Sequence, residues 1–200
     1  VLLCSTAEMF GHPAHSPQNE LTPIEPVSPY GAVKAFAHRM AQVSRSHGQP
    51  VSTVILYNHE SPRRPDTFVT RKITKAAARI ANGSDEPLHL GNMSARRDWG
   101  FAGDYVRAMR AAVRADEPDD FVIATGISHS IEDFVSQAFA AAGITDWRAH
   151  VAVDEGLLRP QDPADFVGDA SKAERVLGWR PEVDFAGLVA MMVEHDLALQ

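Results

Sequence analysis

The sequence has 200 residues, of which 44% are hydrophobic and 22% are charged, and this composition excludes a disordered or fibrous chain. The formal net charge of -7 argues against a dedicated nucleic-acid binder, because neutralising phosphates requires a basic surface. A single cysteine, Cys4, excludes a disulfide framework and a thiolate zinc site, and no apolar run approaches the roughly 20 residues that span a bilayer, so we expect a cytoplasmic protein without a membrane partner.

Strands and helices alternate along the chain. Apolar runs, caps and glycines predict, in order, a strand at residues 1–4, a helix at 29–46, a strand at 51–57, a helix at 68–81, a strand at 88–90, a helix at 102–114, a strand at 121–124 and helices at 131–142, 172–177 and 185–197. Residues 5–27 and 91–99 are predicted to be loops. This alternation indicates an α/β fold with a largely parallel sheet.

Polar residues mark where the predicted helices begin. Ser28 precedes Pro29, the typical arrangement of a hydroxyl N-cap and a first-turn proline. Ser130 and Ser171 each precede an acidic residue by three positions and predict capping boxes, and Asp184 predicts the cap of the last helix.

Cations are concentrated in one stretch of this acidic chain. Between residues 63 and 79 the only acid is Asp66, and the cations are Arg63, Arg64, Arg71, Lys72, Lys75 and Arg79. Such a stretch suits a phosphorylated ligand, and a solvated helix face would explain the same charges.

Tyr30 and Lys34 lie four residues apart in the helix predicted at 29–46. This spacing places the phenol and the ammonium on one helix face, an arrangement in which a cation can support a phenol as a general base. Thr6 and Glu8 follow the first strand, at the sheet edge where open α/β folds bind ligands. Taken alone, a Tyr and a Lys at this spacing are usually a packed ring and a solvated amine. Thr6 and Glu8, taken alone, are better explained as a turn former and a surface acid.

The Tyr-x-x-x-Lys spacing, two dozen residues after a strand ending in Ser-Thr, resembles the extended short-chain dehydrogenases/reductases. Within that superfamily the chain resembles the GDP-mannose 4,6-dehydratase family from end to end. The segments that carry this likeness are QNELTP (residues 18–23), SPYG (28–31), NHESPRR (58–64), TFVTRKI (67–73), RDWG (97–100), GDYV (103–106), VIATG (122–126) and LGWRP (177–181).

The resemblance implies a partial Rossmann-type parallel sheet with a smaller mixed α/β lobe that binds the substrate. Residues 1–200 would form one fragment, the C-terminal two-thirds of such an enzyme, in which the end of the dinucleotide-binding domain is interleaved with the nucleotide-sugar lobe. No G-x-x-G-x-x-G follows a strand, so we expect the pyrophosphate-binding half to lie outside this chain. The strands at 1–4 and 51–57 would both pair with that half.

The activity implied by the resemblance is a hydro-lyase reaction of GDP-fucose biosynthesis. It converts GDP-mannose to GDP-4-keto-6-deoxymannose with retained NADP, in a homodimer or homotetramer. By the same resemblance Tyr30 deprotonates the C4 hydroxyl with help from Thr6 and Lys34, and Glu8 removes the C5 proton. A simple oxidoreductase has no use for that carboxylate, whereas a dehydratase requires a second acid/base group.

The resemblance also implies two sets of ligand contacts. The residues expected to contact NADP are Tyr30, Lys34, His59 and Arg64. The residues expected to contact the GDP-sugar are Asn58, Val69, Lys72, Arg97 and Arg159.

Other residues are read as structural. Trp99 and Tyr105 are expected in the core, Arg96 on the surface, and His12 and His15 in a surface loop rather than a metal site. The chain departs from the family pattern at Pro65, Asp162 and residues 154–158.

Two other functions stay open at the level of sequence. The chain could belong to an extended reductase or epimerase that acts on another nucleotide sugar, although such epimerases commonly lack a carboxylate at the position of Glu8. It could also be a catalytically silent remnant that binds a nucleotide sugar and pairs with a complete subunit.

Overall fold

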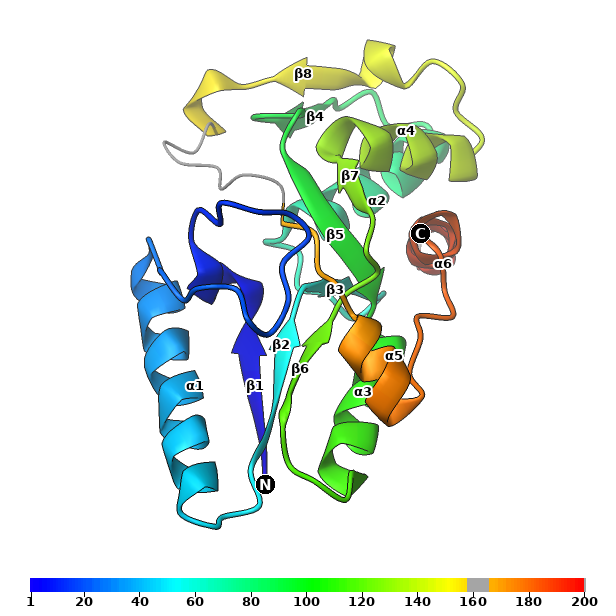
Figure 1. Ribbon diagram of the computed structural model, residues 1–200. Helices are drawn as coiled ribbons and strands as arrows, with labels where there is room; N and C mark the ends of the chain where they lie inside the picture. Colours follow the sequence, from blue (N-terminus) through cyan, green and yellow to red (C-terminus); the bar gives the residue numbers. More distant parts are fainter. Residues whose placement is uncertain (158–165, 200) are drawn as a thin grey trace. The chain divides into compact units, whose positions relative to one another are not determined.

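The computed structural model describes residues 1–157 and 166–199, apart from the side chain of Glu155. The chain forms two compact units, each assembled from three separate segments (Figure 1). Unit 1 comprises Val1–His59, Arg97–Ser128 and Pro163–Glu182, and unit 2 comprises Glu60–Arg96, His129–Asp162 and Val183–Gln200.

Unit 1 is built on a parallel sheet with the order β1-β2-β6. Its strands are β1 (Leu2–Thr6), β2 (Ser52–Leu56) and β6 (Asp120–Ile123). Cys4 pairs with Val54, which in turn pairs with Phe121. The predicted α/β fold with a parallel sheet is confirmed.

Three helices cover the two faces of this sheet: α1 (Pro29–Ser46), α3 (Ala102–Arg114) and α5 (Ser171–Leu177). Successive strand residues point to opposite faces, so Ile55 packs in one core cluster with Ala35 of α1. Val54 packs in the other cluster, with Tyr105 of α3 and the ring of Trp179. Packing on both faces of the sheet thereby supports the strands, including β1 and the start of the loop that follows it.

The expectation that both predicted strands pair outside the chain is wrong for the second. β2 has β1 on one side and β6 on the other, which makes it the central strand of this sheet. The described residues give β1 a neighbour on one side only, and Leu2, Leu3 and Cys4 are half-buried rather than buried.

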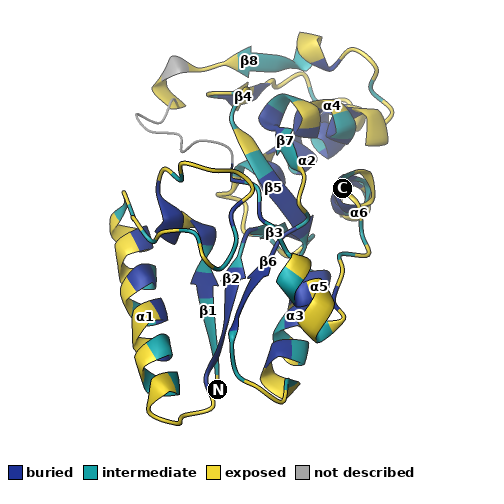
Figure 2. Cartoon of the chain, viewed as in Figure 1, coloured by how far each residue is buried: buried dark blue, intermediate teal, exposed yellow. Residues whose placement is uncertain are grey.

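Unit 2 is mainly a cluster of three packed helices: α2 (Val69–Ala81), α4 (Ile131–Ala141) and α6 (Phe185–Leu197). Figure 2 shows buried residues along α4 in dark blue. A buried ion pair between Arg71 and Asp196 joins α2 to α6. A parallel pair of short strands, β4 (Leu88–Leu90) and β8 (Val151–Val153), belongs to the same unit.

Several short elements escape prediction from sequence. A second sheet has the order β3-β5-β7 and consists of β3 (Asn58–Glu60), β5 (Arg96–Phe101) and β7 (Ser128–Ser130). The 3-10 helices are η1 (Ala7–Phe10), η2 (Trp147–His150) and η3 (Glu155–Leu157). The predicted loop at 91–99 is therefore wrong in its last part, because β5 begins with two arginines and an aspartate and shows no apolar run.

The predicted helix caps are confirmed in three of the four cases. Ser28 and Asp184 accept backbone hydrogen bonds at the starts of α1 and α6, and Ser130 forms a complete capping box. The capping box predicted at Ser171 is wrong. Ser171 is already inside α5, and its backbone N–H donates to the carboxylate of Asp169 at 2.9 Å.

A buried polar cluster at the start of β6 makes unit 1 sensitive to acid. His38 of α1 is 2% exposed and lies 3.7 Å from the carboxylate of Asp120. Burial lowers the pKa of His38 below 6.5, although the charge of Asp120 raises it in part. The unfolded chain therefore binds a proton before the folded chain does, and stability is lost as the pH falls below about 6.5.

Relative to His38→Gln, we expect the wild type to lose melting temperature as the pH falls through this range, because only the wild type carries the buried imidazole. The matched control is His47→Gln, at the exposed end of the same helix, which should leave the pH dependence unchanged. Thermal melts at a series of pH values measure this, and identical profiles for His38→Gln and the wild type would contradict it.

Candidate active site

The loop that follows β1 carries a hydroxyl and a carboxylate in one tight turn. Thr6 is the N-cap of η1, and its Oγ1 accepts a hydrogen bond from the backbone N–H of Glu8 at 3.3 Å. The carboxylate of Glu8 is exposed and accepts a hydrogen bond from Ser28 Oγ at 3.4 Å. Ser28 Oγ also accepts the backbone N–H of Gly31 at 3.0 Å, so one hydroxyl connects Glu8 to the start of α1.

Gly31 allows the first turn of α1 to approach this loop closely. A Cβ atom at this position would lie 2.7 Å from the backbone oxygen of Glu8, a distance that real side chains do not tolerate. The glycine between Tyr30 and Lys34 therefore fixes how near the catalytic candidates of α1 lie to Glu8.

Lys34 contacts the backbone of β1, and Tyr30 lies beside Lys34. Lys34 Nζ donates a hydrogen bond to the backbone oxygen of Cys4 at 2.9 Å and lies 5.8 Å from the centre of the Tyr30 ring. Tyr30 is 52% exposed, so the residue is open to solvent. Unit 1 thus brings together Thr6, Glu8, Tyr30 and Lys34, a hydroxyl, a carboxylate, a phenol and an amine that could transfer two different protons.

Three further predicted residues lie on β3 and β5. The ring of His59 is stacked on buried Tyr105 with 5.0 Å between ring centres, and its Nδ1 lies 2.9 Å from the backbone oxygen of Tyr57. Asn58 and Arg97 are half-buried, and the backbone of Arg97 forms a bridge with Phe166.

The residues expected to be structural follow their predictions. Trp99 and Tyr105 are buried in the core, and Arg96 is exposed.

The cation-rich stretch of unit 2 divides into paired and unpaired groups. Arg71 is buried against Asp196, so it does not belong to a cationic surface. The other cations with a carboxylate partner are Arg64 with Glu60, Lys75 with Asp66 and Arg79 with Glu86.

Two predicted GDP-sugar contacts lie in the first turn of α2. Lys72 is exposed and has no ion-pair partner among the described residues, whereas Val69 is half-buried. Arg159 and Asp162 lie outside the described residues.

Sequence reasoning missed two residues of the site. Ser28 was identified only as a helix cap, yet it also donates to the carboxylate of Glu8. Glu60 lies within the segment NHESPRR and was assigned no contact, yet it is buried beside Arg64. In both cases the signal was that the residue lies close along the sequence to a predicted site residue.

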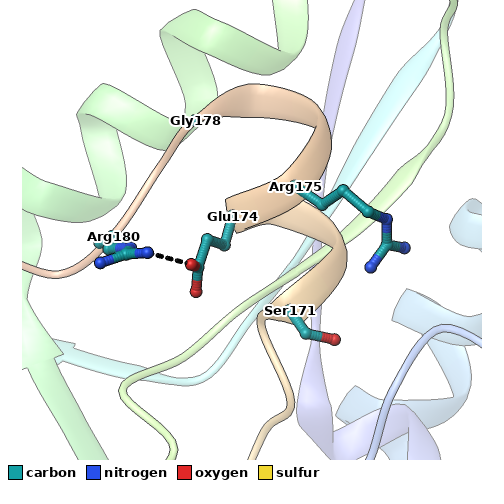
Figure 3. Close-up of a pocket in the computed structure, with 5 residues that line it drawn as sticks. All are labelled: Ser171, Glu174, Arg175, Gly178 and Arg180. Carbon is teal, nitrogen blue, oxygen red and sulfur yellow. Dashed lines mark hydrogen bonds and ion pairs between the residues drawn. The ribbon is translucent and has the colours of Figure 1, made fainter.

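An open pocket of about 610 Å³ lies on unit 1, in a part of the sequence that is separate from the candidate site residues. It is lined by Ser171, Glu174, Arg175, Gly178 and Arg180 (Figure 3). Glu174 and Arg180 form an ion pair with each other, and none of the predicted site residues lines this pocket.

Within residues 1–157 and 166–199, no three His, Cys, Asp or Glu residues are grouped so that they could hold a metal ion. The helices in these same ranges are too short or too polar to cross a membrane.

Comparisons with known proteins give one consistent family. The family model described as GDP-mannose 4,6 dehydratase matches residues 1–192. GDP-mannose 4,6 dehydratase 1 of Arabidopsis thaliana is 47% identical over 195 residues, which cover 97% of this chain and 54% of the relative. The chain therefore spans about half the length of this relative.

Solved structures of related folds are similar over the whole chain. RMD from Pseudomonas aeruginosa, complexed with NADPH, has a TM-score of 0.89 at 19% identity, covering 100% of this chain and 67% of that one. The dTDP-glucose 4,6-dehydratase from Bacillus anthracis in complex with NAD has a TM-score of 0.85 at 20% identity, covering 97% of this chain and 60% of that one. At these identities the likeness shows the shared fold.

Proposed function

Because this chain belongs to the GDP-mannose 4,6-dehydratase family, we propose that it carries the acid/base half of a hydro-lyase that converts GDP-mannose to GDP-4-keto-6-deoxymannose and water. The observation that supports this most is the grouping of Glu8 with Thr6, Tyr30 and Lys34 after β1. A carboxylate beside a Tyr-Lys pair provides the second proton-transfer group that dehydration requires.

The proposed roles follow from the chemistry of each group. Tyr30 removes the proton of the C4 hydroxyl, which Thr6 holds by a hydrogen bond. Lys34, anchored to the backbone of Cys4, stabilises the phenolate by its positive charge. Glu8 then removes the C5 proton, which is acidic because it lies next to the new C4 carbonyl.

A nicotinamide cofactor, when bound, supplies the hydride acceptor and donor of this reaction. We propose NADP, held in part by Tyr30, Lys34, His59 and Arg64. One phenol, one imidazole and two cations form a donor set that suits ribose hydroxyls and phosphates. The relative fold from Pseudomonas aeruginosa binds NADPH and that from Bacillus anthracis binds NAD.

The nucleotide sugar would be held by other residues. We assign Asn58, Val69, Lys72, Arg97 and Arg159 to the GDP-mannose side. Unit 1 would be the C-terminal part of the dinucleotide-binding domain, and unit 2 the nucleotide-sugar lobe. The complete enzyme would act as a cytoplasmic homo-oligomer in GDP-fucose biosynthesis.

The test uses a completed polypeptide, in which residues 1–200 are joined to the part of the Arabidopsis thaliana relative that lies outside the matched range. With NADP it should form the 4-keto-6-deoxy product from GDP-mannose and leave UDP-glucose and dTDP-glucose unchanged. Epimerisation or reduction of another nucleotide sugar would favour the first alternative function. Binding of GDP-mannose without turnover would favour the silent remnant.

Lys72→Ala in the completed polypeptide is expected to weaken GDP binding by about 1.5–3 kcal/mol, the range for hydrogen bonds to charged groups. Lys72 is an exposed ammonium without an ion-pair partner among the described residues, so it is available to a diphosphate.

The matched controls are Lys75→Ala and Arg79→Ala in the same helix, whose charges are already paired with Asp66 and Glu86. Isothermal titration with GDP compares them. Equal losses at all three positions would mean that these cations act only through their bulk potential.

A further inference from the structure

Glu60 is a buried carboxylate with no task in the proposed reaction. It is the last residue of β3 and is 2% exposed. Its Oε2 accepts a hydrogen bond from Thr70 Oγ1 at 2.9 Å and lies 3.1 Å from Arg64 Nε. Glu60, Arg64 and Thr70 all belong to unit 2.

Arg64 is held on two sides of its guanidinium. Its buried Nε forms an ion pair with Glu60 that lacks the geometry of a hydrogen bond, and the guanidinium lies over the ring of Phe68 at 3.5 Å from the ring centre. The side chain remains 23% exposed, and its two terminal amino groups have no partner among the described residues. Those amino groups form the fork with which arginine binds a phosphate.

Burying the carboxylate of Glu60 costs folding free energy, and this cost calls for an explanation in the contact with Arg64. Burial raises the pKa of Glu60 to about 7, while Arg64 and the hydrogen bond from Thr70 lower it in part. A buried ion pair adds little stability compared with well-packed apolar side chains of the same size. The ion pair is better explained by its effect on Arg64, because it fixes the direction of the side chain and restricts its movement.

We propose that Glu60 is a positioning residue, which fixes Arg64 through Nε so that its terminal amino groups receive a phosphate group of a bound ligand. Thr70 orients the carboxylate, and Phe68 supports the flat face of the guanidinium. The proposal rests on the proposed function for the presence of a phosphate ligand. Both NADP and GDP-mannose carry phosphates, and separate titrations distinguish the two sources.

The experiment measures the affinities of the completed polypeptide for NADP and for GDP by isothermal titration. Glu60→Gln keeps the shape of the side chain and an acceptor for Thr70 but removes the charge that holds Arg64. Because Arg64 is assigned to NADP, we expect the affinity for NADP to fall about tenfold, the loss of one charge-assisted contact, and the affinity for GDP to stay unchanged. Glu86→Gln, which removes the exposed carboxylate paired with half-buried Arg79, is the matched control and should change neither.

A second measurement separates positioning from general damage to the fold. In an Arg64→Ala background Glu60→Gln should have no further effect on affinity, because the coupling of the two residues is then absent. Thr70→Val, which keeps the shape and the charge of the pair, should weaken the same ligand by a smaller factor. It also provides a readout if Glu60→Gln does not fold.

Unchanged affinities in folded Glu60→Gln, or an equal loss in the Arg64→Ala background, would overturn the proposal. If Glu60→Gln does not fold, an unchanged affinity of Thr70→Val for both ligands would overturn it as well. These titrations need no turnover. A wild type that binds NADP or GDP but does not dehydrate GDP-mannose would therefore refute the proposed function alone, and a wild type that binds neither would refute both.

Discussion

Glu8→Gln is expected to abolish dehydration by the completed polypeptide, with a loss of at least about 100-fold, the usual lower limit for removing a general base. The amide has the size of the carboxylate and can still accept the hydrogen bond from Ser28, so the loop after β1 should keep its structure. It cannot accept the C5 proton. The affinity for GDP-mannose should therefore stay nearly unchanged while product formation stops.

This block should come after oxidation at C4. Tyr30 and Lys34 are intact in Glu8→Gln, so reduced nicotinamide should accumulate in the presence of GDP-mannose and be visible by its absorbance. The control is Glu25→Gln, which alters an exposed carboxylate on a neighbouring loop segment and should leave turnover as it is. Dehydration within a few-fold of wild type would remove Glu8 from the mechanism.

Tyr30→Phe is expected to stop the reaction one step earlier. Without the phenol the C4 hydroxyl keeps its proton, so C4 cannot be oxidised and no reduced nicotinamide should appear. The phenylalanine ring retains the apolar contacts of a side chain that is already half exposed, so the fold should be unaffected. We expect a loss of turnover comparable to that of Glu8→Gln, in the range known for general-base residues.

Stopped-flow absorbance with GDP-mannose distinguishes the two variants, since one should accumulate reduced nicotinamide and the other none. Accumulation in Tyr30→Phe would falsify the assignment of Tyr30 as the base at C4 and would direct attention to Thr6 or Lys34.

The elements that sequence predicts well are those with a strong local signal. The runs at 51–57 and 102–114 have the periods of a buried strand and an amphipathic helix, and both elements are present. The strands of the β3-β5-β7 sheet have three to six residues and contain His, Glu, Arg and Asp. Their pairing depends on partners far away in the chain, so no local pattern predicts them.

The same distinction between local and long-range signals applies to the residues of the candidate site. The four-residue spacing of Tyr30 and Lys34 is a property of any helix, and their grouping could be predicted before the structure was known. Burial could not. The stretch RKITKAAAR (residues 71–79) does not show which of its two arginines is buried, yet Arg71 is enclosed with Asp196 and Arg79 is paired with exposed Glu86.

Within the described part of the chain β1 has a neighbouring strand on one side only, and this affects how the chain behaves in isolation. Among the described residues Leu2–Thr6 pair only with β2, so the other side of the strand has no strand partner for its amides and carbonyls, although the backbone oxygen of Cys4 accepts a hydrogen bond from Lys34. Such an edge is a template for another strand, from any chain that can reach it. The isolated 200 residues would then assemble more readily as their concentration rises, and light scattering would follow this association. Covering that edge with a fused strand should therefore reduce this association.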